Sequence, residues 1–450
     1  MYDILPLLQC LMFHLDTTTL HRMSIVVTAL FAMSGRITML GIARWSGEGG
    51  SYRTIQRFFN TLMPWPTLMW EFFRCHCWRR QDTYLLVGDE VVVTKAGKKT
   101  YGLGRFFSSL YDHPVAGLAF FCLSLVSVEH RQSHPVRLEQ LMRSEVKAKQ
   151  EDKAVGATGT STDAKSAPSK RKPGRPKGSK NKAKTEVCLN AELRLIKGAI
   201  LALLSLIAGL LPISYLLLDG QFGNNHALQM ARQCSLHLIS KLRYDSQLFL
   251  PYHGPDGRRK YGDRLNPRQL SSDYRVTSFV EEDIRTDIYQ LTALNPSFGC
   301  PLNVVVILKT HLKTQQQLHV ILFSSDLELS YDKLMDYYSL RFQIEFNFRD
   351  AKQFWGLEDF MNTTERGVTN AANLSLFMVG VSHRLLQDVK RDWPECSILD
   401  LKAWFRGFVY VQEVLKLLPE KLDPILSMPI FAKVANLGAI HPIPAPDSVL

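Results

Sequence analysis

Cysteine is scarce in this 450-residue sequence, and its placement does not fit the usual zinc-binding patterns. Among the eight cysteines, Cys75 and Cys77 lie close together, in the tripeptide CHC. No second pair follows at the spacing that a structural zinc site requires. We therefore expect free thiols in a reducing compartment.

The sequence also lacks the patterns of an export signal and of a membrane anchor. Its first ten residues, MYDILPLLQC, contain an acid and no basic region, which is not typical of a signal peptide. One uncharged stretch, residues 198–218, has the length of a bilayer span, but Pro212 divides it. Apolar residues recur at helical spacing before the proline, and ISYLLLD after it is typical of a buried strand. We expect a helix, a turn and a strand in a core, with no membrane contact and a cytoplasmic location.

Basic residues are abundant, and they are unevenly distributed. The formal net charge is +12 and the pI is about 9.2, which favours a polyanionic partner such as nucleic acid. Residues 161–185 contain nine lysines and arginines against one aspartate. They lie within a low-complexity stretch, residues 150–187, that is too polar to form a core. We expect this stretch to be a disordered linker.

Within that linker, KPGRPKGSK resembles an AT-hook. In such a motif the Gly-Arg-Pro core lies in the narrow minor groove of A·T-rich DNA, where the negative potential attracts arginine. Arg171, Arg175 and Lys177 are the candidate contacts. The alternative is a solvated basic linker with a general affinity for phosphate.

Residues 36–60 predict two helices around a glycine-rich turn. The first helix is expected from Thr38 to Trp45, and Ser51 is a possible N-cap of a second helix that contains YRTIQRFF. This pattern is typical of a helix-turn-helix, whose second helix can enter the major groove of DNA. The candidate DNA contacts are Arg53, Gln56 and Arg57. An ordinary helical hairpin is the alternative.

Several apolar runs predict strands. The clearest are TYLLVGDEVVVTK (residues 83–95), VAGLAFFCLSLVSV (115–128) and QLHVILFSSDL (317–327). Between residues 236 and 310, further strand-like runs alternate with turn residues. One long helix is expected from Tyr331 to Trp355, and the chain after residue 366 is expected to be mostly helical.

The helix expected at residues 331–355 carries a line of polar residues beside its apolar stripe. The stripe spans an arc of about 80° on a helical wheel and contains Leu340, Ile344, Phe348, Ala351 and Trp355. The polar line spans about 60° and contains Tyr338, Arg341, Glu345 and Lys352. It is either a set of structural ion pairs or a metal-binding carboxylate flanked by cations that bind phosphate.

Two further acids terminate or interrupt apolar strands. Asp89 follows YLLVG, and Asp219 ends ISYLLLD. A carboxylate in such a place is costly unless it is paired or binds a cation. Together with Glu345, these acids would form an oxygen-rich site suited to Mg²⁺ or Mn²⁺. Two such ions can activate a water or a 3′-hydroxyl and stabilise the leaving oxygen of a phosphodiester.

The spacing Tyr338-x2-Arg341-x3-Glu345-x6-Lys352 resembles the Tyr-Arg-Glu-Lys signature of bacterial insertion-sequence DDE transposases of family four. LLVGDEVVVTK, YLLLDGQFG and the segment from LFSSDLELSYDK to GLEDF are similar to that family's three catalytic blocks, so the resemblance covers roughly residues 80–385. It implies a ribonuclease H-like α/β core in which a mixed sheet is flanked by helices. Asp89, Asp219 and Glu345 would be the catalytic, metal-binding triad. Tyr338, Arg341 and Lys352 would hold DNA near the scissile phosphate.

The resemblance and the composition together predict seven segments. These are a helical DNA-binding region (1–80), the first part of the core (81–149), the basic linker (150–187), the second part of the core (188–225), a β-rich insertion (226–300), the third part of the core with the catalytic helix (301–365) and a helical C-terminal region (366–450). Some family members stack a flipped base on a tryptophan in the insertion. Tryptophan is absent between residues 79 and 354 here, so Tyr252, Tyr261 or Phe279 would take that role.

The sequence is therefore interpreted as a DNA transposase that binds insertion-sequence ends, cleaves them with two Mg²⁺ or Mn²⁺ ions and joins 3′-hydroxyl ends to target DNA. Its partner would be double-stranded DNA at the bacterial nucleoid, and the resemblance implies a homodimer on paired ends. Three alternatives stay open: a metal-dependent nuclease without strand transfer, an inactive transposase that acts as a DNA-binding protein, and a membrane protein that uses residues 198–218.

Overall fold

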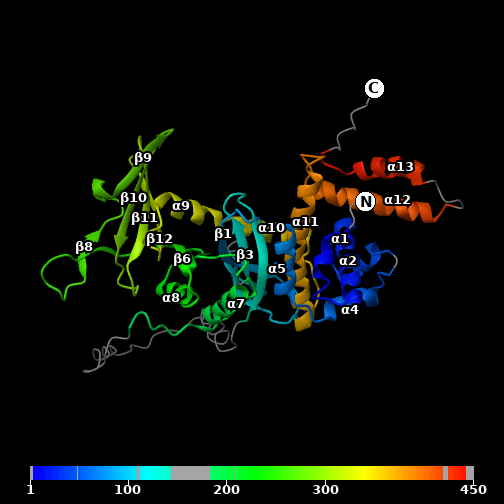
Figure 1. The fold of residues 1–450 in the computed structure, drawn as a ribbon, viewed down its shortest axis with the longest axis horizontal. Coiled ribbons are helices and arrows are strands. Elements are labelled where there is room, and N and C mark those ends of the chain that lie inside the picture. Colours follow the sequence, from blue (N-terminus) through cyan, green and yellow to red (C-terminus); the bar gives the residue numbers. More distant parts are fainter. Residues whose placement is uncertain are drawn as a thin grey trace, which may run out of the picture. The chain divides into compact units, whose positions relative to one another are not determined.

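The computed structural model describes residues 4–47, 49–108, 112–142, 183–207, 209–418 and 424–441. The chain divides into two compact units, and Figure 1 shows their elements along the sequence. Unit 1 contains Met1–Gln140, Ala199–Ile213 and Ser339–Leu450. Unit 2 contains Leu141–Gly198 and Ser214–Tyr338. Each unit is thus assembled from stretches that are far apart in the sequence.

Unit 1 begins with a group of helices. In chain order they are α1 (Ile4–Leu8), the 3-10 turn η1 (Gln9–Leu11), α2 (Thr17–Ala32), α3 (Met39–Trp45), α4 (Tyr52–Asn60) and α5 (Trp65–His76). Helices α3 and α4 are the pair predicted within residues 36–60. Thr38 and Ser51 cap them, because their side chains accept hydrogen bonds from the backbone N–H groups of Gly41 and Thr54.

The sheet of unit 1 is antiparallel. Its strands are β1 (Tyr84–Thr94), β2 (Gly104–Ser108), β3 (His113–Ser127) and β4 (Ser133–Leu141). Strand β3 is central: the whole of β1 pairs with it, and both β2 and β4 also pair with it. The sequence predicted β1 and β3 from their apolar runs but not the shorter, more polar β2 and β4.

Three long helices complete unit 1. They are α10 (Gln343–Phe354), α11 (Glu365–Val389) and α12 (Ile398–Lys416). Helix α10 packs on β1 and β3, α11 packs on α10, α4 and α5, and α12 packs on α2 and on α13 (Pro424–Asn436). These contacts confirm the predicted helical C-terminal region and place one helix, α10, directly on the strand that carries Asp89.

The single helix predicted from Tyr331 to Trp355 is wrong, because two helices occupy that stretch. Helix α9 (Tyr331–Leu340) ends before Arg341, and α10 begins at Gln343. At the junction, the backbone N–H groups of Phe342, Ile344 and Glu345 donate to the carbonyl three residues earlier, as in a tight turn and not in an α-helix. A wheel with one continuous axis therefore does not describe this stretch, and Tyr338 belongs to a different helix from Glu345.

Unit 2 is built on a mixed sheet in the order β5-β6-β12-β11-β10-β9. These strands are β5 (Tyr215–Leu217), β6 (His237–Leu242), β9 (Arg275–Glu281), β10 (Ile284–Ala293), β11 (Leu302–His311) and β12 (Gln317–Ser324). Strands β5 and β6 are parallel and are joined through the 3-10 turn η2 (Gly220–Phe222) and helix α8 (Asn225–Gln233), as a parallel pair requires a crossover. The remaining pairs are antiparallel. A separate two-stranded ribbon consists of β7 (Leu248–Pro251) and β8 (Tyr261–Leu265).

The predicted fold class is confirmed. The chain is of mixed α/β class, and its antiparallel pairs β1–β3 and β2–β3 and its parallel pair β5–β6 are consistent with a ribonuclease H-like fold. The stretch around Pro212 forms α7 (Ala191–Ile207) and then β5, as predicted. In the part of the chain that the structure describes, no helix has both the length and the apolar character to cross a bilayer.

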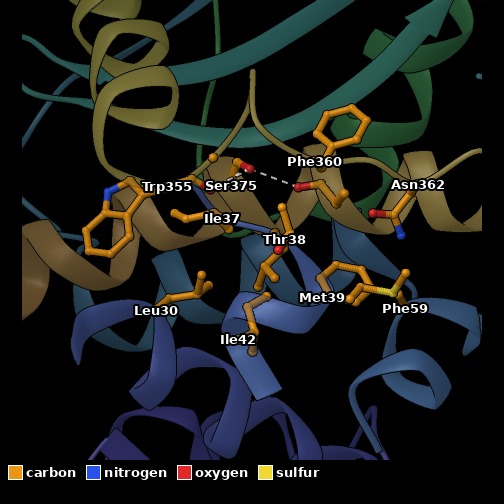
Figure 2. A pocket seen from close by; sticks show the side chains of 13 residues that line it. Leu30, Ile37, Thr38, Met39, Ile42, Phe59, Trp355, Phe360, Asn362 and Ser375 are labelled. Carbon is orange, nitrogen blue, oxygen red and sulfur yellow. Dashed lines mark hydrogen bonds between the residues drawn. The ribbon is translucent and has the colours of Figure 1, made fainter. Parts of the chain in front are cut away.

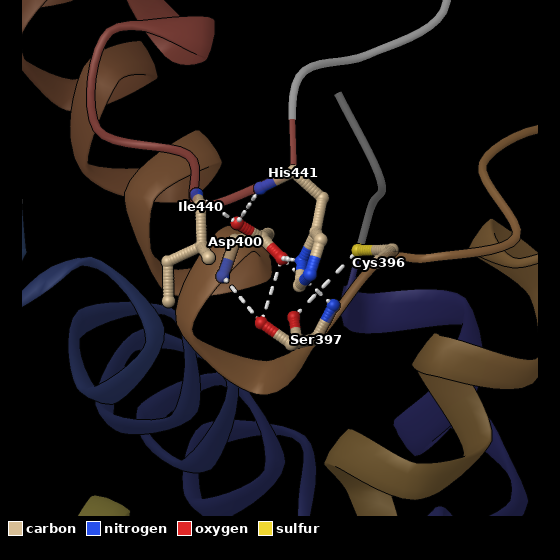
Figure 3. A network of polar contacts seen from close by, with 5 residues as sticks. All are labelled: Cys396, Ser397, Asp400, Ile440 and His441. Carbon is tan, nitrogen blue, oxygen red and sulfur yellow. Dashed lines mark hydrogen bonds and ion pairs between the residues drawn. The ribbon is translucent and has the colours of Figure 1, made fainter.

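A buried aspartate fixes the last described residues to α12 (Figure 3). The fully buried Asp400 forms a capping box with Ser397, and its carboxylate also accepts hydrogen bonds from the backbone N–H groups of Ile440 and His441 and from His441 Nδ1. Burial alone would raise the pKa of Asp400, but the hydrogen bonds from Ser397 and His441 outweigh it and lower that pKa to about 2. The carboxylate is therefore ionised at neutral pH.

Candidate active site

Arg341 brings two of the predicted catalytic acids together in unit 1. Its Nη1 lies 3.0 Å from Asp89 Oδ2, and its Nη2 lies 3.0 Å from Glu345 Oε1. Asp89 comes from the middle of β1, Arg341 from the turn before α10, and Glu345 from the first turn of α10. One guanidinium thus bridges two carboxylates whose residues are far apart in the sequence.

The three groups differ in their access to solvent. The side chains of Asp89 and Arg341 are 17% and 16% exposed, whereas Glu345 is 40% exposed. The backbone N–H of Glu90 also donates to Asp89 Oδ1, at 2.9 Å. Two carboxylates face one guanidinium at a partly buried place, so the local electrostatic potential is negative. Such a potential favours the binding of another cation in place of the guanidinium.

Lys352 anchors the other end of α10 to the same strand. Its Nζ donates to the carbonyl oxygen of Val92 at 3.0 Å and pairs with Glu358 Oε1 at 2.9 Å. Lys95, at the end of β1, donates to the carbonyls of Glu358 and Phe360, and burial lowers its pKa to about 8. The predicted DNA contacts Arg341 and Lys352 therefore both bond to protein oxygens in this structure.

Two buried polar residues of α10, which the sequence did not single out, also fix this helix. Asn347 Nδ2 donates to Ser133 Oγ at 2.7 Å and to Ser124 Oγ at 3.3 Å, which ties α10 to β3 and β4. Asp350 pairs with Arg349 and with His383 of α11. Burial alone would raise the pKa of Asp350, but the hydrogen bonds from His383 and Arg349 lower it. A polar side chain on the apolar face of an amphipathic helix is the sequence pattern that could have identified both residues.

Asp219 lies in unit 2, two residues after the end of β5. Its side chain is partly exposed and accepts a hydrogen bond from the backbone N–H of Gln221 at 3.2 Å, so that it caps η2. Its carbonyl oxygen accepts from Ser240 Oγ at 2.7 Å. Gly223 ends this turn because a Cβ there would lie 2.1 Å from the carbonyl oxygen of Lys241. The motif YLLLDGQFG thus fixes an acid at the carboxyl end of a parallel strand.

The donor set has the chemistry that a divalent ion needs. Asp89 and Glu345 supply hard carboxylate oxygens around a single cation-binding point, which suits Mg²⁺ or Mn²⁺. Asp219 belongs to unit 2. Among the described residues, no three or more His, Cys, Asp or Glu side chains gather closely enough to hold a metal ion.

Helix α4 presents its predicted DNA contacts to solvent. Arg53, Gln56 and Arg57 are exposed, and the opposite face of the helix is buried through Ile55, Phe58 and Phe59. The C-terminal end of α4 is held by α11, because Asn370 Nδ2 donates to the carbonyls of Phe59 and Thr61, each at 2.8 Å. Tyr338 is partly exposed on α9. The AT-hook-like residues Arg171, Arg175 and Lys177 lie outside the described residues.

The start of α3 packs against the loop that follows α10 (Figure 2). A cavity of about 10 Å³ between them is lined by side chains that include Ile37, Thr38, Trp355 and Phe360, and it has room for about one water molecule. Gly356 has φ +77°, and a Cβ there would lie 2.5 Å from Ile37. The backbone N–H of Ile37 donates to Asp359 at 3.1 Å. The cavity is thus a packing junction between the helix pair and α10, and it is too small for a ligand.

The chain matches a known protein family. Residues 7–292 match the family described as DDE superfamily endonuclease, and no curated protein matches the chain. The matched residues are well over half of the chain and include both Asp89 and Asp219. The predicted kinship with DDE enzymes is therefore confirmed at the level of the superfamily: the chain belongs to the DDE superfamily endonucleases.

Proposed function

We propose that this protein is a DNA transposase that binds the ends of an insertion sequence, cleaves them and joins their 3′-hydroxyl ends to target DNA. Membership of the DDE superfamily implies an endonuclease that acts on DNA. The observation that carries the proposal is the carboxylate pair Asp89 and Glu345, which meets on one cation at the junction of β1 and α10. Asp219, at the end of β5, is the third acid of the proposed triad.

In this proposal Asp89, Asp219 and Glu345 hold two Mg²⁺ or Mn²⁺ ions. Such ions, when bound, activate a water or a 3′-hydroxyl and stabilise the leaving oxygen of the phosphodiester. The residues of the chain position these groups. Asn347 ties α10 to β4, Lys352 ties it to β1, and Lys95, just after β1, holds the loop that follows α10. Cleavage then depends on carboxylates that are already held in place.

Arg341 has two roles in the proposed cycle. Without a metal ion it neutralises the carboxylate pair, at 3.0 Å from each. When other cations take over that neutralisation, the guanidinium is free to bind a phosphate oxygen of the scissile strand, for which its planar fork is well suited. Tyr338 and Lys352 would contact the same DNA strand. Lys352 would have to exchange the carbonyl of Val92 for a phosphate.

Recognition of the element's ends is assigned to helix α4. Arg53, Gln56 and Arg57 lie together on its exposed face, and guanidinium and amide groups of this kind read base edges in the major groove. Arg171, Arg175 and Lys177 would add minor-groove contacts through the AT-hook-like linker. A homodimer on paired ends would bring two such sets of contacts to the DNA.

The triad assignment is tested with Glu345→Gln on a DNA fragment that carries the element's own ends. The variant should retain DNA binding and lose Mg²⁺-dependent cleavage, because it removes a metal ligand and keeps the side-chain volume. A matched control is Glu413→Gln, which changes an exposed, ion-paired glutamate of α12. If Glu345→Gln cleaves the fragment like the control, the assignment is wrong.

A nuclease that cleaves without strand transfer is the second candidate, and the endonuclease description of the matched family favours it directly. Both candidates use the same acids, so the assay must separate two steps. DNA ends that already carry a free 3′-hydroxyl are incubated with a supercoiled target and Mg²⁺. Covalent joining supports the transposase, and cleavage of uncut ends without any joining of pre-cut ends supports the nuclease.

A further inference from the structure

A basic ribbon extends from unit 2. The family match covers its residues, but none of the proposed triad lies on it. Strands β7 and β8 form a two-stranded antiparallel ribbon that is not part of the main sheet. We call residues 248–268, which contain both strands, their connecting loop and the residues after β8, the arm. Figure 1 shows the loop next to β8 extending outward from the sheet of unit 2.

The arm carries an excess of unpaired positive charge. Its five basic residues are all exposed, and its two acids leave a net charge of +3. The basic residues are Arg258, Arg259, Lys260, Arg264 and Arg268. Asp256 accepts a hydrogen bond from the backbone N–H of Arg258 and does not pair with a cation of the arm.

Several other cations of unit 2 form ion pairs with neighbouring acids. Arg243 pairs with Asp245, Arg285 with Asp287, and Lys313 with Asp283. Across the described chain, none of the five arm cations makes an ion pair with a carboxylate. Their charge therefore remains available to an anion from outside the protein.

Aromatic side chains hold part of this charge in a fixed place. The guanidinium of Arg259 lies 4.7 Å from the ring centroid of Tyr252, and its Nε donates to the carbonyl of Tyr261 at 3.0 Å. Lys260 Nζ lies 6.0 Å from the ring centroid of Tyr261, which also contacts Phe249. Such cation–π contacts hold the side chains in place before a ligand binds. The side chains therefore lose less conformational entropy on binding.

The root of the arm is attached to the main sheet of unit 2. Phe249 and Leu294 exchange two backbone hydrogen bonds, of 2.9 Å and 2.8 Å, and Leu248 is buried. The arm is therefore anchored at its base beside β10, while its basic loop is exposed. This arrangement lets the ribbon present its cations without unfolding.

We propose that the arm is a second DNA-binding element, which contacts the phosphate backbone of duplex DNA; this proposal rests on the proposed function. A two-stranded β-ribbon has the width of the major groove, and arginine matches the geometry of phosphate oxygens. The described arm has no large apolar side chain among the exposed ones, as insertion into a lipid surface would require. With Tyr252 covered by Arg259, the arm is suited to backbone contact and not to the stacking of a flipped base.

The test compares two variants that each lose three positive charges from unit 2. The arm variant is Arg258→Gln, Arg259→Gln and Lys260→Gln. The control variant is Arg243→Gln, Lys309→Gln and Lys313→Gln, all exposed residues outside the arm. Affinity for a 30-base-pair duplex of arbitrary sequence is measured by fluorescence anisotropy, in EDTA and over a series of salt concentrations. Thermal unfolding of each variant verifies that it is folded.

The salt dependence of binding gives the decisive readout. Each lost phosphate contact lowers the slope of log affinity against log salt by about 0.9, so three contacts lower it by about 2–3 units. We expect that loss in the arm variant and a loss below about one unit in the control. Equal slopes in the two variants would overturn the proposal. A further variant, Arg264→Gln with Arg268→Gln, repeats the test in case the first does not fold.

The experiments distinguish failure of the arm proposal from failure of the proposed transposase function. The binding assay contains no metal ion, so it does not depend on cleavage. If the arm variant loses slope and the wild-type protein does not cleave DNA, the arm proposal stands and the transposase proposal fails. If the wild-type protein cleaves DNA and the arm variant binds like the control, the arm proposal fails alone.

Discussion

The cations around α10 and those on α4 and the arm have the same chemistry but opposite surroundings. Arg341, Lys352 and Lys95 bond to carboxylates or backbone carbonyls of unit 1. Arg53 and Arg57 on α4, and the basic residues of the arm, are exposed to solvent. The basic residues around α10 are therefore already engaged in contacts within the protein, whereas those on α4 and the arm are exposed. The two groups should respond differently to substitution.

The largest effect is expected when the carboxylate pair itself is broken. Asp89→Asn keeps the shape of the side chain but removes a metal ligand and one partner of Arg341. We expect DNA cleavage to fall by about 10³-fold or more, with DNA affinity in EDTA kept within a few-fold. Single-turnover cleavage and anisotropy measure the two quantities. Equal losses in cleavage and in affinity would place Asp89 with the DNA contacts instead.

A smaller effect on stability is expected from Arg341→Gln. The substitution leaves Asp89 and Glu345 close together without their shared cation, which should lower the free energy of unfolding by about 2–3 kcal/mol. Because Mg²⁺ can then neutralise the pair, Mg²⁺ should raise the melting temperature of the variant more than that of the wild type. Differential scanning fluorimetry with and without Mg²⁺ checks this. An unchanged melting temperature in both conditions would show that the bridge is not formed in solution.

The Asp400 network tests the contribution of ion pairing to stability alone. None of its residues is a proposed catalytic or DNA-binding residue. Its folded pKa, about 2, is below the ordinary value of 3.8, so its contribution is present above about pH 4 and is lost as the pH falls through about 2. A shift of this size corresponds to about 2 kcal/mol at neutral pH. Asp400→Asn should therefore be destabilised by about that amount at pH 7, and the difference should shrink towards zero as the pH falls through about 2. Urea unfolding at several pH values measures it, and a constant difference would contradict the assignment.

The smallest effect on stability is expected on α4. Arg53→Gln with Arg57→Gln changes two exposed side chains, so the free energy of unfolding should change by less than about 0.5 kcal/mol. The salt slope of binding to the element's ends should fall by about 2 units if both residues contact phosphates. Thermal melts and anisotropy titrations test the pair of expectations. A stable variant with unchanged DNA binding would remove α4 from the proposed interface.

Local patterns made much of the fold predictable. The caps Thr38 and Ser51, the apolar runs of β1 and β3 and the helix–turn–strand around Pro212 each depend on a few neighbouring residues. Strands β2 and β4 were missed because they are short or polar, and they form because β3 offers hydrogen-bonding partners. The interruption between α9 and α10 at residues 341–342 was missed because no glycine or proline lies there to predict it.

The sequence singled out three acids, whose catalytic role stays a prediction, but it did not predict that Arg341 pairs with two of them. Asp89 and Asp219 stood out because they lie in or after apolar strands. Glu345 stood out because it lies in the line of polar residues beside the apolar stripe. Arg341, in the same line, was interpreted as a DNA contact. Its bond to Asp89 spans 252 residues of sequence, and no local pattern can locate a partner at that separation. Asn347 and Asp350 were overlooked because they act through partners on other elements. Asn347 donates a hydrogen bond to Ser133, and Asp350 pairs with His383.

The most direct test of the central claim is Mg²⁺-dependent cleavage of DNA that carries the element's own ends, by the wild type and by Asp219→Asn. Asp219 is the third acid of the proposed triad, so its substitution asks whether cleavage needs all three acids. Cleavage at the ends by the wild type, and none by the variant at equal DNA occupancy, is the predicted result. Equal cleavage by the two proteins would contradict the account.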